Sequence, residues 1–318
     1  MTTTTRPARA PNTTPSSAGP TAVDRTADHP AAVDRAADPP AADLHAADHQ
    51  ATDHHAANRH AARPHEAEGP VLFGRYAFPP NERGYCGPDR ADELLERVAS
   101  GASGPELGEV ARGFGGAWPY LEFIGECLGL PPLDATVVRT YWLGGPHLAR
   151  CGGRRLVDSL ETRFKPRLSR LEFERLAAAA IAGATPHHNF HVFGVYPWVG
   201  LLHGGMGEAP LQVLDRCRIR WGHVAEVHGD TAVVSSRTLT WDGRRLALGP
   251  PIAETARLRR DGHALARDVE PGDWVSLHWD WVCDRLGPSE LTHLRRTTAI
   301  ELAAVGGVAY PAPARVLA

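Results

Sequence analysis

The first 69 residues of the chain contain almost no side chain that can form a hydrophobic core. They include no Ile, Phe, Trp or Tyr, and Leu44 is their only large aliphatic residue apart from valine. Ordering such a segment costs conformational entropy that so little apolar burial cannot offset. We therefore expect residues 1–69 to be a disordered tail, and we expect the folded structure to begin near residue 70.

Short, erratic repeats of alanine, aspartate and histidine fill much of this tail. They are typical of low-complexity sequence and not of a solenoid, whose repeats have a fixed and longer period. The histidines of the tail could take up Ni²⁺ or Zn²⁺, but they show no regular ligand spacing: His29, His45, His49, His54, His55, His60 and His65. We interpret the tail as a solvated spacer, and we expect residues 307–318 to be a flexible C-terminus.

Charge and apolar patterning exclude several classes of protein. The formal net charge is −3 at pH 7, so the chain lacks the basic surface that nucleic-acid binding requires. No apolar run approaches the roughly 18 residues of a membrane helix, and the polar N-terminus lacks a signal-peptide pattern. We therefore expect a cytoplasmic protein that binds neither nucleic acid nor membrane. The five cysteines are odd in number and widely spaced, which predicts reduced thiols and no disulfide framework.

From about residue 70 to 210 the sequence predicts a module of short helices. Prolines and glycines between 79 and 88 predict an irregular loop at its start. Leu94, Leu95 and Val98 then recur at helical spacing, which predicts a helix over 89–100.

A capping box marks the clearest helix of this module. In the stretch SRLE, Ser169 and Glu172 can each satisfy an unpaired amide at a helix start. The alanine-rich run that follows extends this helix through Ile181, and Gly183 is expected to end it.

From about residue 211 the apolar pattern takes the period of strands. The stretch RIRWGHVAEV alternates, which predicts a first strand with Cys217 at its start. The residues HGD at 228–230 and the pair Asp242-Gly243 predict turns between strands. Further strands are predicted over 253–259 and 273–283.

Together these signals predict the fold class. Five short antiparallel strands favour a small closed barrel of the OB-like type, because closure removes exposed edges. A C-terminal helix is predicted from Pro288 and completes a second module over 211–306. The expected class is therefore α+β, with a disordered tail, an all-α module, and a five-stranded barrel followed by a helix.

Two groups of side chains in the first module are candidates for chemistry. His187, His188 and His191 lie close together in the sequence, and two imidazoles on one face can bind Zn²⁺, Fe²⁺ or Ni²⁺. The H-E-x-x-H pattern is missing, which disfavours a metalloprotease. The alternative is that these histidines hydrogen-bond the backbone beneath an aromatic core. Cys86, in the stretch GYCGP, is a candidate ligand or nucleophile on an exposed loop.

Two motifs in the second module occur in the order of a known family. Cys217 is followed five residues later by Gly222 and a predicted hairpin. The later stretch GDWVSLH contains a glycine–aromatic–valine–histidine series: Gly272, Trp274, Val275 and His278. With the leucine-containing terminal helix, this order resembles the small hydrogenase assembly chaperones of the HypC/HupF type over about residues 217–305. Gly222 and Gly272 are expected at structural turns.

The resemblance implies a role for two residues. Cys217 would supply a thiolate that helps to hold iron destined to carry cyanide and carbon monoxide, with His278 beside it. The protein would be a non-catalytic accessory that docks on the large subunit of an [NiFe] hydrogenase or on a maturation factor. A soft thiolate suits such iron. Unlike the family's N-terminal cysteine, Cys217 is internal, so chemistry of a free α-amine is excluded.

The ordered region as a whole also resembles an uncharacterised family of actinobacterial proteins, through stretches such as RYAFPPNERGYCGP and HHNFHVFGVYPWVGLL. Two alternatives stand beside the hydrogenase accessory. One is a metal-dependent enzyme of unknown reaction, in which the histidine cluster and Cys86 or Cys217 meet between the modules. The other is a non-catalytic protein-interaction module.

Overall fold

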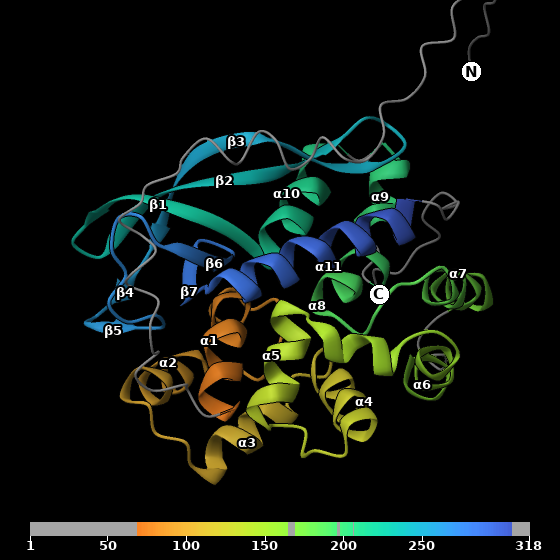
Figure 1. Ribbon diagram of the computed structural model, residues 1–318, viewed down its shortest axis with the longest axis horizontal. Coiled ribbons are helices and arrows are strands. Elements are labelled where there is room, and N and C mark those ends of the chain that lie inside the picture. The colour runs from red at the N-terminus through yellow and green to blue at the C-terminus, as the bar shows by residue number, and fades with distance from the viewer. Residues whose placement is uncertain (1–68, 165–168, 196–197, 206, 307–318) are drawn as a thin grey trace, which may run out of the picture. The chain divides into compact units, whose positions relative to one another are not determined.

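The computed structural model describes residues 69–164, 169–195, 198–205 and 207–306 (Figure 1). All of them belong to one compact unit of the chain, residues 55–318. The predicted disordered tail and flexible C-terminus fall outside the described residues, except for Gly69, which begins a helix. None of the described helices combines the length and the apolar character that crossing a membrane requires.

Helices make up the first part of the described chain. They are α1 (Gly69–Glu82), α2 (Ala91–Ser100), α3 (Pro105–Arg112), α4 (Trp118–Leu128), α5 (Ala135–Leu143), η3 (Pro146–Cys151), α6 (Arg154–Phe164), α7 (Arg170–Ile181), α8 (His188–Phe190), η5 (His191–Val195), α9 (Trp198–His203) and α10 (Glu208–Cys217). Helix α2 confirms the helix predicted over 89–100. Helix α7 confirms the predicted capping box, because the Ser169 hydroxyl accepts from the Glu172 amide and the Glu172 carboxylate accepts from the Ser169 amide.

Helix α1 overturns part of the irregular loop that was predicted over 79–88. Pro79 and Pro80 lie inside its last turns. The aromatic side chains of this helix are almost fully buried: Phe73, Tyr76 and Phe78. Burying each such side chain stabilises the fold by about 1.5–3 kcal/mol, so together they are comparable to the roughly 3 kcal/mol that each of the two helical prolines costs.

The main sheet contains β1 (Arg220–His228), β2 (Thr231–Trp241), β3 (Leu246–Arg257), β6 (Trp274–His278) and β7 (Trp281–Arg285). They pair in the order β1-β2-β3-β7-β6, and pairing of β6 with β1 closes the sheet into a barrel. Strands β3 and β7 meet in parallel through Arg257 and Trp281, whereas the other described pairings are antiparallel. A separate ladder joins β4 (Arg259–Arg260) and β5 (His263–Ala264). The mixed α+β class is confirmed.

The predicted turns at 228–230 and at Asp242-Gly243 are confirmed, since they join β1 to β2 and β2 to β3. The separate strand predicted over 253–259 is wrong, because most of this segment is the second half of β3. That strand continues through Pro251, which pairs with Arg237 beside a bulge in β2. A bulge interrupts the ladder locally, so a residue without an N–H is tolerated there.

The single strand predicted over 273–283 is also wrong. It consists of β6 and β7, joined by a tight turn at Trp279 and Asp280. Trp279 has a φ of 54°, a left-handed conformation that non-glycine residues seldom adopt. The sequence carries no glycine at this turn, so its apolar pattern alone indicated an unbroken strand.

Cys217 ends α10 instead of opening the first strand, so the helical segment extends past the predicted boundary at residue 210. Leu211, Leu214 and Cys217 recur at helical spacing and pack in one cluster with Leu239 of β2. The strand pattern begins only after the extended Arg218.

Helix α11 (Pro288–Gly306) confirms the predicted terminal helix. It runs between the helices and the sheet in Figure 1 and contacts α5, β1 and β3. One hydrophobic cluster joins α1 to the sheet, with Phe73 and Tyr76 on one side and Trp281 and Cys283 on the other. The candidate site lies where these elements meet.

Candidate metal centre

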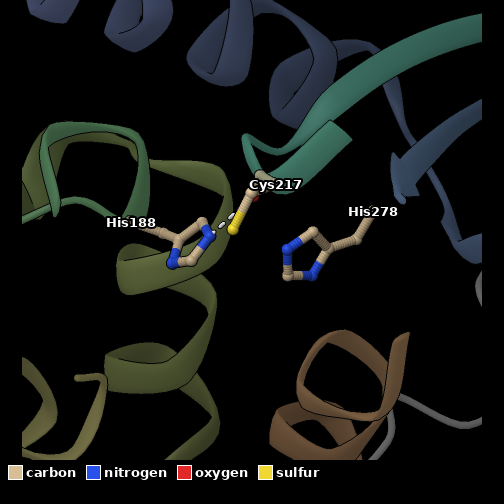
Figure 2. A group of neighbouring side chains, drawn as sticks. All are labelled: His188, Cys217 and His278. Atoms are coloured by element: carbon tan, nitrogen blue, oxygen red, sulfur yellow. Dashed lines mark hydrogen bonds between the residues drawn. The ribbon is translucent and has the colours of Figure 1, made fainter. Parts of the chain in front are cut away.

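Three buried side chains from distant parts of the sequence meet at this junction: His188, Cys217 and His278 (Figure 2). One ligand-capable atom of each lies within 4.8 Å of those of the other two. His188 begins α8, Cys217 ends α10, and His278 ends β6. Their exposed fractions are 6%, 8% and 0%, so the cluster is shielded from bulk water.

Asn189 ties the segment that carries His188 to the chain that follows Cys217. Its Oδ1 accepts from the amide of Ile219 at 2.8 Å, and its Nδ2 donates to Thr298 Oγ1 on α11 at 3.0 Å. His187 caps α8, because its Nδ1 accepts from the Asn189 amide at 3.0 Å. These bonds orient the short helix so that the His188 ring faces the end of α10.

His278 has one nitrogen engaged and one available. Its Nδ1 lies 2.6 Å from the carbonyl oxygen of Tyr76. A carbonyl only accepts, so Nδ1 carries the proton and Nε2 of the neutral ring has a lone pair. Nε2 is buried and makes no hydrogen bond of regular geometry among the described residues, although the Cys217 carbonyl lies near enough to the ring to raise its pKa in part. Figure 2 shows Nε2 directed at the Cys217 sulfur. Burial, and then the nearby His188, lower the pKa of His278 well below its usual range, so the ring stays neutral.

Pro80 explains why the Tyr76 carbonyl is available. In an α-helix the carbonyl of residue i accepts from the N–H of residue i+4. Pro80 stands four residues after Tyr76 and has no N–H to donate. The Tyr76 carbonyl accepts from His278 instead, while the Tyr76 hydroxyl bonds Ser276 Oγ at 2.8 Å. Helix α1 therefore holds β6 at two points beside the cluster.

His188 uses both ring nitrogens in the described geometry. Its Nε2 donates to the Cys217 carbonyl oxygen at 2.9 Å, and its Nδ1 accepts from the Tyr141 hydroxyl at 3.1 Å. Burial lowers the pKa of His188 to about 4, so this ring is neutral as well. His188 can therefore ligate a metal through Nε2 only by giving up the carbonyl of Cys217.

The Cys217 thiol lies between the two rings (Figure 2). Burial raises the pKa of this thiol far above its usual range, and the nearby Cys86 adds to the rise. The neighbouring Trp279 side chain acts in the opposite sense and lowers this pKa. The thiol is therefore neutral near pH 7, and metal binding would displace its proton.

The buried Arg220 braces the turn that follows His278. Arg220 donates to the Trp279 carbonyl oxygen and to Glu254, and the Trp279 amide donates to the Arg216 carbonyl oxygen at 2.7 Å. These contacts hold the left-handed conformation of Trp279, whose cost is of order 1–3 kcal/mol. The strained turn fixes where β6 ends, and so fixes the direction of His278.

The remaining predicted site residues lie outside the cluster, and Cys86, predicted on an exposed loop, is half-buried and packs against the core. His187 Nε2 is 3.1 Å from the Trp142 carbonyl oxygen, and burial lowers the pKa of His187 to about 3. His191 Nδ1 lies 3.3 Å from the Tyr120 hydroxyl. Neither ring joins the cluster. A Cβ at Gly222 would lie 2.2 Å from Val234 Cγ1, so Gly222 allows close packing of β1 on β2. The turn predicted at Gly222 is therefore wrong, because this residue lies within β1, whereas Gly272 does form a turn with φ of 93°.

Sequence reasoning paired Cys217 with His278 but assigned His188 to a separate group. It also missed the backbone carbonyl of Tyr76. A signal for that carbonyl was present, because Pro80 removes its helical donor. No comparable local signal links His188 to Cys217, since folding alone brings α8 to the end of α10.

The fold and the cluster define a class: an α+β protein with a buried Cys/His₂ group between a helical layer and a closed sheet. The chain belongs to the family of unknown function DUF6390, whose model matches residues 65–310. This match confirms membership of an uncharacterised family. No curated protein and no solved structure matches the chain. The resemblance to hydrogenase assembly chaperones stays a prediction.

Proposed function

We propose that this protein binds one thiophilic transition-metal ion through Cys217, His278 and His188. The observation that carries the proposal is the Nε2 atom of His278, which is fully buried, makes no hydrogen bond of regular geometry among the described residues and faces the Cys217 sulfur. Buried polar atoms in folded proteins are almost always satisfied, by an ion if not by protein or water. A thiolate and two imidazoles suit Zn²⁺ and Fe²⁺, and iron is the expectation from the family resemblance.

The donor atoms require only a modest contraction to share an ion. Bonds of about 2.3 Å to sulfur and 2.0–2.1 Å to nitrogen place tetrahedral ligands roughly 3.5 Å apart. The atoms of the cluster lie within 4.8 Å of one another. The Nδ1 bond from His278 to Tyr76 is the outer contact that metal-binding histidines commonly make, because it fixes the tautomer and the ring orientation.

A cysteine–histidine nucleophile fits this environment less well. Such a pair works as a thiolate beside an imidazolium, so both groups must carry charge. Burial raises the pKa of Cys217 and lowers that of His278, which disfavours both charged forms. A divalent cation offsets the thiolate charge and needs neutral imidazoles, which is the state that this burial favours.

Metal analysis of the full-length chain after anaerobic purification tests the proposal. We expect one equivalent of iron or zinc that Cys217→Ser and His278→Gln each remove. The tail histidines are retained in both variants, so metal bound there does not change between samples. His228→Gln, at an exposed histidine, is the matched control. Equal metal content in wild type and Cys217→Ser would overturn the proposal.

A second candidate function is an accessory role in [NiFe] hydrogenase assembly, with an OB-like barrel that carries iron. The motif order from Cys217 to His278 and the proximity of these two side chains support it. Because Cys217 is 8% exposed, ligation of iron fits better than direct docking of the thiol on a partner. Copurification with a hydrogenase large subunit or a maturation factor, lost in Cys217→Ser, tests this role. Infrared bands of iron-bound cyanide and carbonyl would support it further.

A further inference from the structure

The two histidines of the centre have hydrogen-bond partners of different chemistry on the side away from Cys217. His278 Nδ1 lies 2.6 Å from the Tyr76 carbonyl oxygen, which can only accept, so the proton of this ring is fixed on Nδ1. His188 Nδ1 instead lies 3.1 Å from the Tyr141 hydroxyl, which can donate or accept. One imidazole is therefore held in a single tautomer, whereas the other can change its tautomer and keep the same partner.

In the described geometry, His188 has the tautomer that cannot bind a metal through Nε2. Its Nε2 lies 2.9 Å from the Cys217 carbonyl oxygen and carries the proton, because a carbonyl only accepts. Nδ1 then accepts from the Tyr141 hydroxyl. Figure 2 shows the dashed hydrogen bond of Nε2 on the side of the ring that faces Cys217. The nitrogen that is placed to reach an ion is therefore the protonated one.

A change of tautomer makes His188 Nε2 available as a ligand. One proton leaves Nε2 and one is taken up at Nδ1, so the number of protons on the ring stays the same. The hydroxyl hydrogen of Tyr141 rotates away from Nδ1, and the hydroxyl oxygen then accepts from the new Nδ1–H. The bond from Nε2 to the Cys217 carbonyl is given up in this step, and Nε2 gains the lone pair that binds the ion.

Packing holds the Tyr141 hydroxyl where this change requires it. Tyr141 is a fully buried residue of α5, and its ring stacks on the Tyr120 ring with centroids 5.7 Å apart. The Trp142 ring lies 4.6 Å from the Tyr141 ring and 4.7 Å from the His188 ring. With these rings packed together, the Tyr141 oxygen stays within reach of Nδ1 in both tautomers, and only the hydroxyl hydrogen has to turn.

We propose that Tyr141 is a positioning residue that lets His188 change tautomer when the centre takes up its ion, so that His278 is a fixed ligand and His188 a switched one. This inference rests on the proposed function. An imidazole bound to a cation donates more strongly, since charge-assisted hydrogen bonds are roughly twice as strong as neutral ones. The Tyr141 contact therefore stabilises the metal-bound centre more than the metal-free one. His188 has partners for both nitrogens in either form, which suits reversible uptake and release of the ion.

Nuclear magnetic resonance of the full-length protein with isotope-labelled histidine tests the change of tautomer. Long-range nitrogen–proton correlations distinguish the two neutral forms of each ring, and His188→Gln identifies the signals of His188. We expect His188 to change from the Nε2–H form to the Nδ1–H form when Zn²⁺ is added, while His278 keeps its proton on Nδ1. An Nδ1–H form of His188 before zinc is added, or an unchanged form when zinc binds, overturns the inference.

Zinc affinity tests the role of the Tyr141 hydroxyl. Tyr141→Phe should lower the affinity about tenfold, the lower end of the loss when the outer partner of a ligand is removed. Tyr120→Phe is the matched control, because Tyr120 is also buried and its hydroxyl lies 3.3 Å from Nδ1 of His191, which is outside the cluster. We expect the control to keep wild-type affinity. Equal affinities in the two variants overturn the inference, and the tautomer measurement on the wild type decides it if Tyr141→Phe does not fold.

The same experiments separate this inference from the proposed function. Zinc binding that depends on Cys217 but leaves the tautomer of His188 unchanged overturns the role of Tyr141 and leaves the metal centre standing. If the wild type shows no zinc binding that depends on Cys217, the proposed function is overturned and this inference with it.

Discussion

Two regions of the described chain bury cysteine beside another reactive group, and they differ in what surrounds the sulfur. Between the helices and the sheet, Cys217 lies between two imidazoles. In the helical layer, Cys151 of η3 hydrogen-bonds the side chain of Cys127 of α4. Burial raises the pKa of both Cys151 and Cys217. Shielding from water is therefore common to both regions.

The two regions differ in whether a metal-ligating atom beside the sulfur is left without a hydrogen-bond partner. Cys151 has a second thiol beside it, and its Sγ also lies 3.8 Å from the His147 carbonyl oxygen. Beside Cys217, the Nε2 atom of His278 is unsatisfied among the described residues. A buried thiol by itself is therefore a packing residue. It becomes a candidate metal ligand when a neighbouring imidazole directs its lone pair at the sulfur.

The largest expected effect comes from removing the central sulfur. Cys217→Ser should lower Zn²⁺ affinity at least 100-fold, because a hydroxyl is a far poorer ligand for thiophilic ions. Saturating zinc should raise the thermal midpoint of wild type, since ligand at 100 times its Kd stabilises by about 2.7 kcal/mol, and should leave the variant unshifted. Thermal unfolding with and without zinc measures this. Cys151→Ser should keep the zinc-induced shift of the thermal midpoint. If both variants lost that shift equally, the proposed difference between Cys217 as a ligand and Cys151 as a packing residue would be contradicted.

The pH dependence of binding should follow the thiol and not the imidazoles. The raised pKa of Cys217 keeps the thiol protonated near pH 7, so binding releases a proton and affinity rises up to tenfold per pH unit for each thiol. Burial lowers the pKa of His188 to about 4, so His188 binds no proton above about pH 5 and adds nothing to this slope. Calorimetry in buffers of different ionisation enthalpy counts the protons. An affinity independent of pH between 6 and 8 would contradict the assignment of a thiol ligand.

Replacing Pro80 should lower the zinc affinity of the centre, although Pro80 is not itself a ligand. Pro80→Ala restores an N–H that competes with His278 for the Tyr76 carbonyl, so the imidazole loses its fixed orientation. We expect zinc affinity to fall about tenfold while the helix itself becomes no less stable. Pro79→Ala lies in the same turn but restores the donor to the preceding carbonyl, so it is the matched control. Equal affinities in the two variants would show that the Tyr76 contact does not position His278.

The smallest expected effect on metal binding comes from Glu301, a buried carboxyl of α11 outside both regions. Burial raises its pKa from 4.5 to about 8, and Thr185 donates to its Oε1 at 3.0 Å from the backbone amide. Between these pH values the unfolded chain has lost a proton that the folded chain keeps, so the free energy of unfolding falls as pH rises and levels off above about 8. Glu301→Gln should remove this slope in urea unfolding at pH 5, 7 and 9 and leave zinc affinity unchanged. The same pH slope in wild type and variant would contradict the raised pKa.

Local sequence signals predicted those parts of the fold in which neighbours along the chain decide the structure. The capping box at Ser169 and the turn at Asp242-Gly243 depend on residues a few positions apart, and both are confirmed. The failures occur where burial overrides local preference. Pro80 remains in a helix because that helix is surrounded by the core, and Trp279 adopts a left-handed turn because the buried Arg220 holds it.

The candidate site likewise has parts that the sequence predicted and parts that it did not. The motif order singled out Cys217 and His278, and the structure places their side chains together. The sequence pattern placed Cys217 on a strand, whereas Cys217 ends helix α10, whose apolar residues recur at helical spacing. It also grouped His188 with His187 and His191, although only His188 joins the cluster, because each ring goes where its own hydrogen bonds direct it.

By itself, the sequence determined the α+β class, the hairpin turns, the terminal helix and the residue types that can hold a metal ion, because composition, period and turn chemistry are local properties. Only the tertiary structure decided that His188 of α8 meets Cys217 of α10, that the Tyr76 carbonyl freed by Pro80 orients His278, and that Cys86 packs against the core. Each of these depends on desolvation and on hydrogen bonds between segments far apart in the chain, and such contacts exist only once the core has formed.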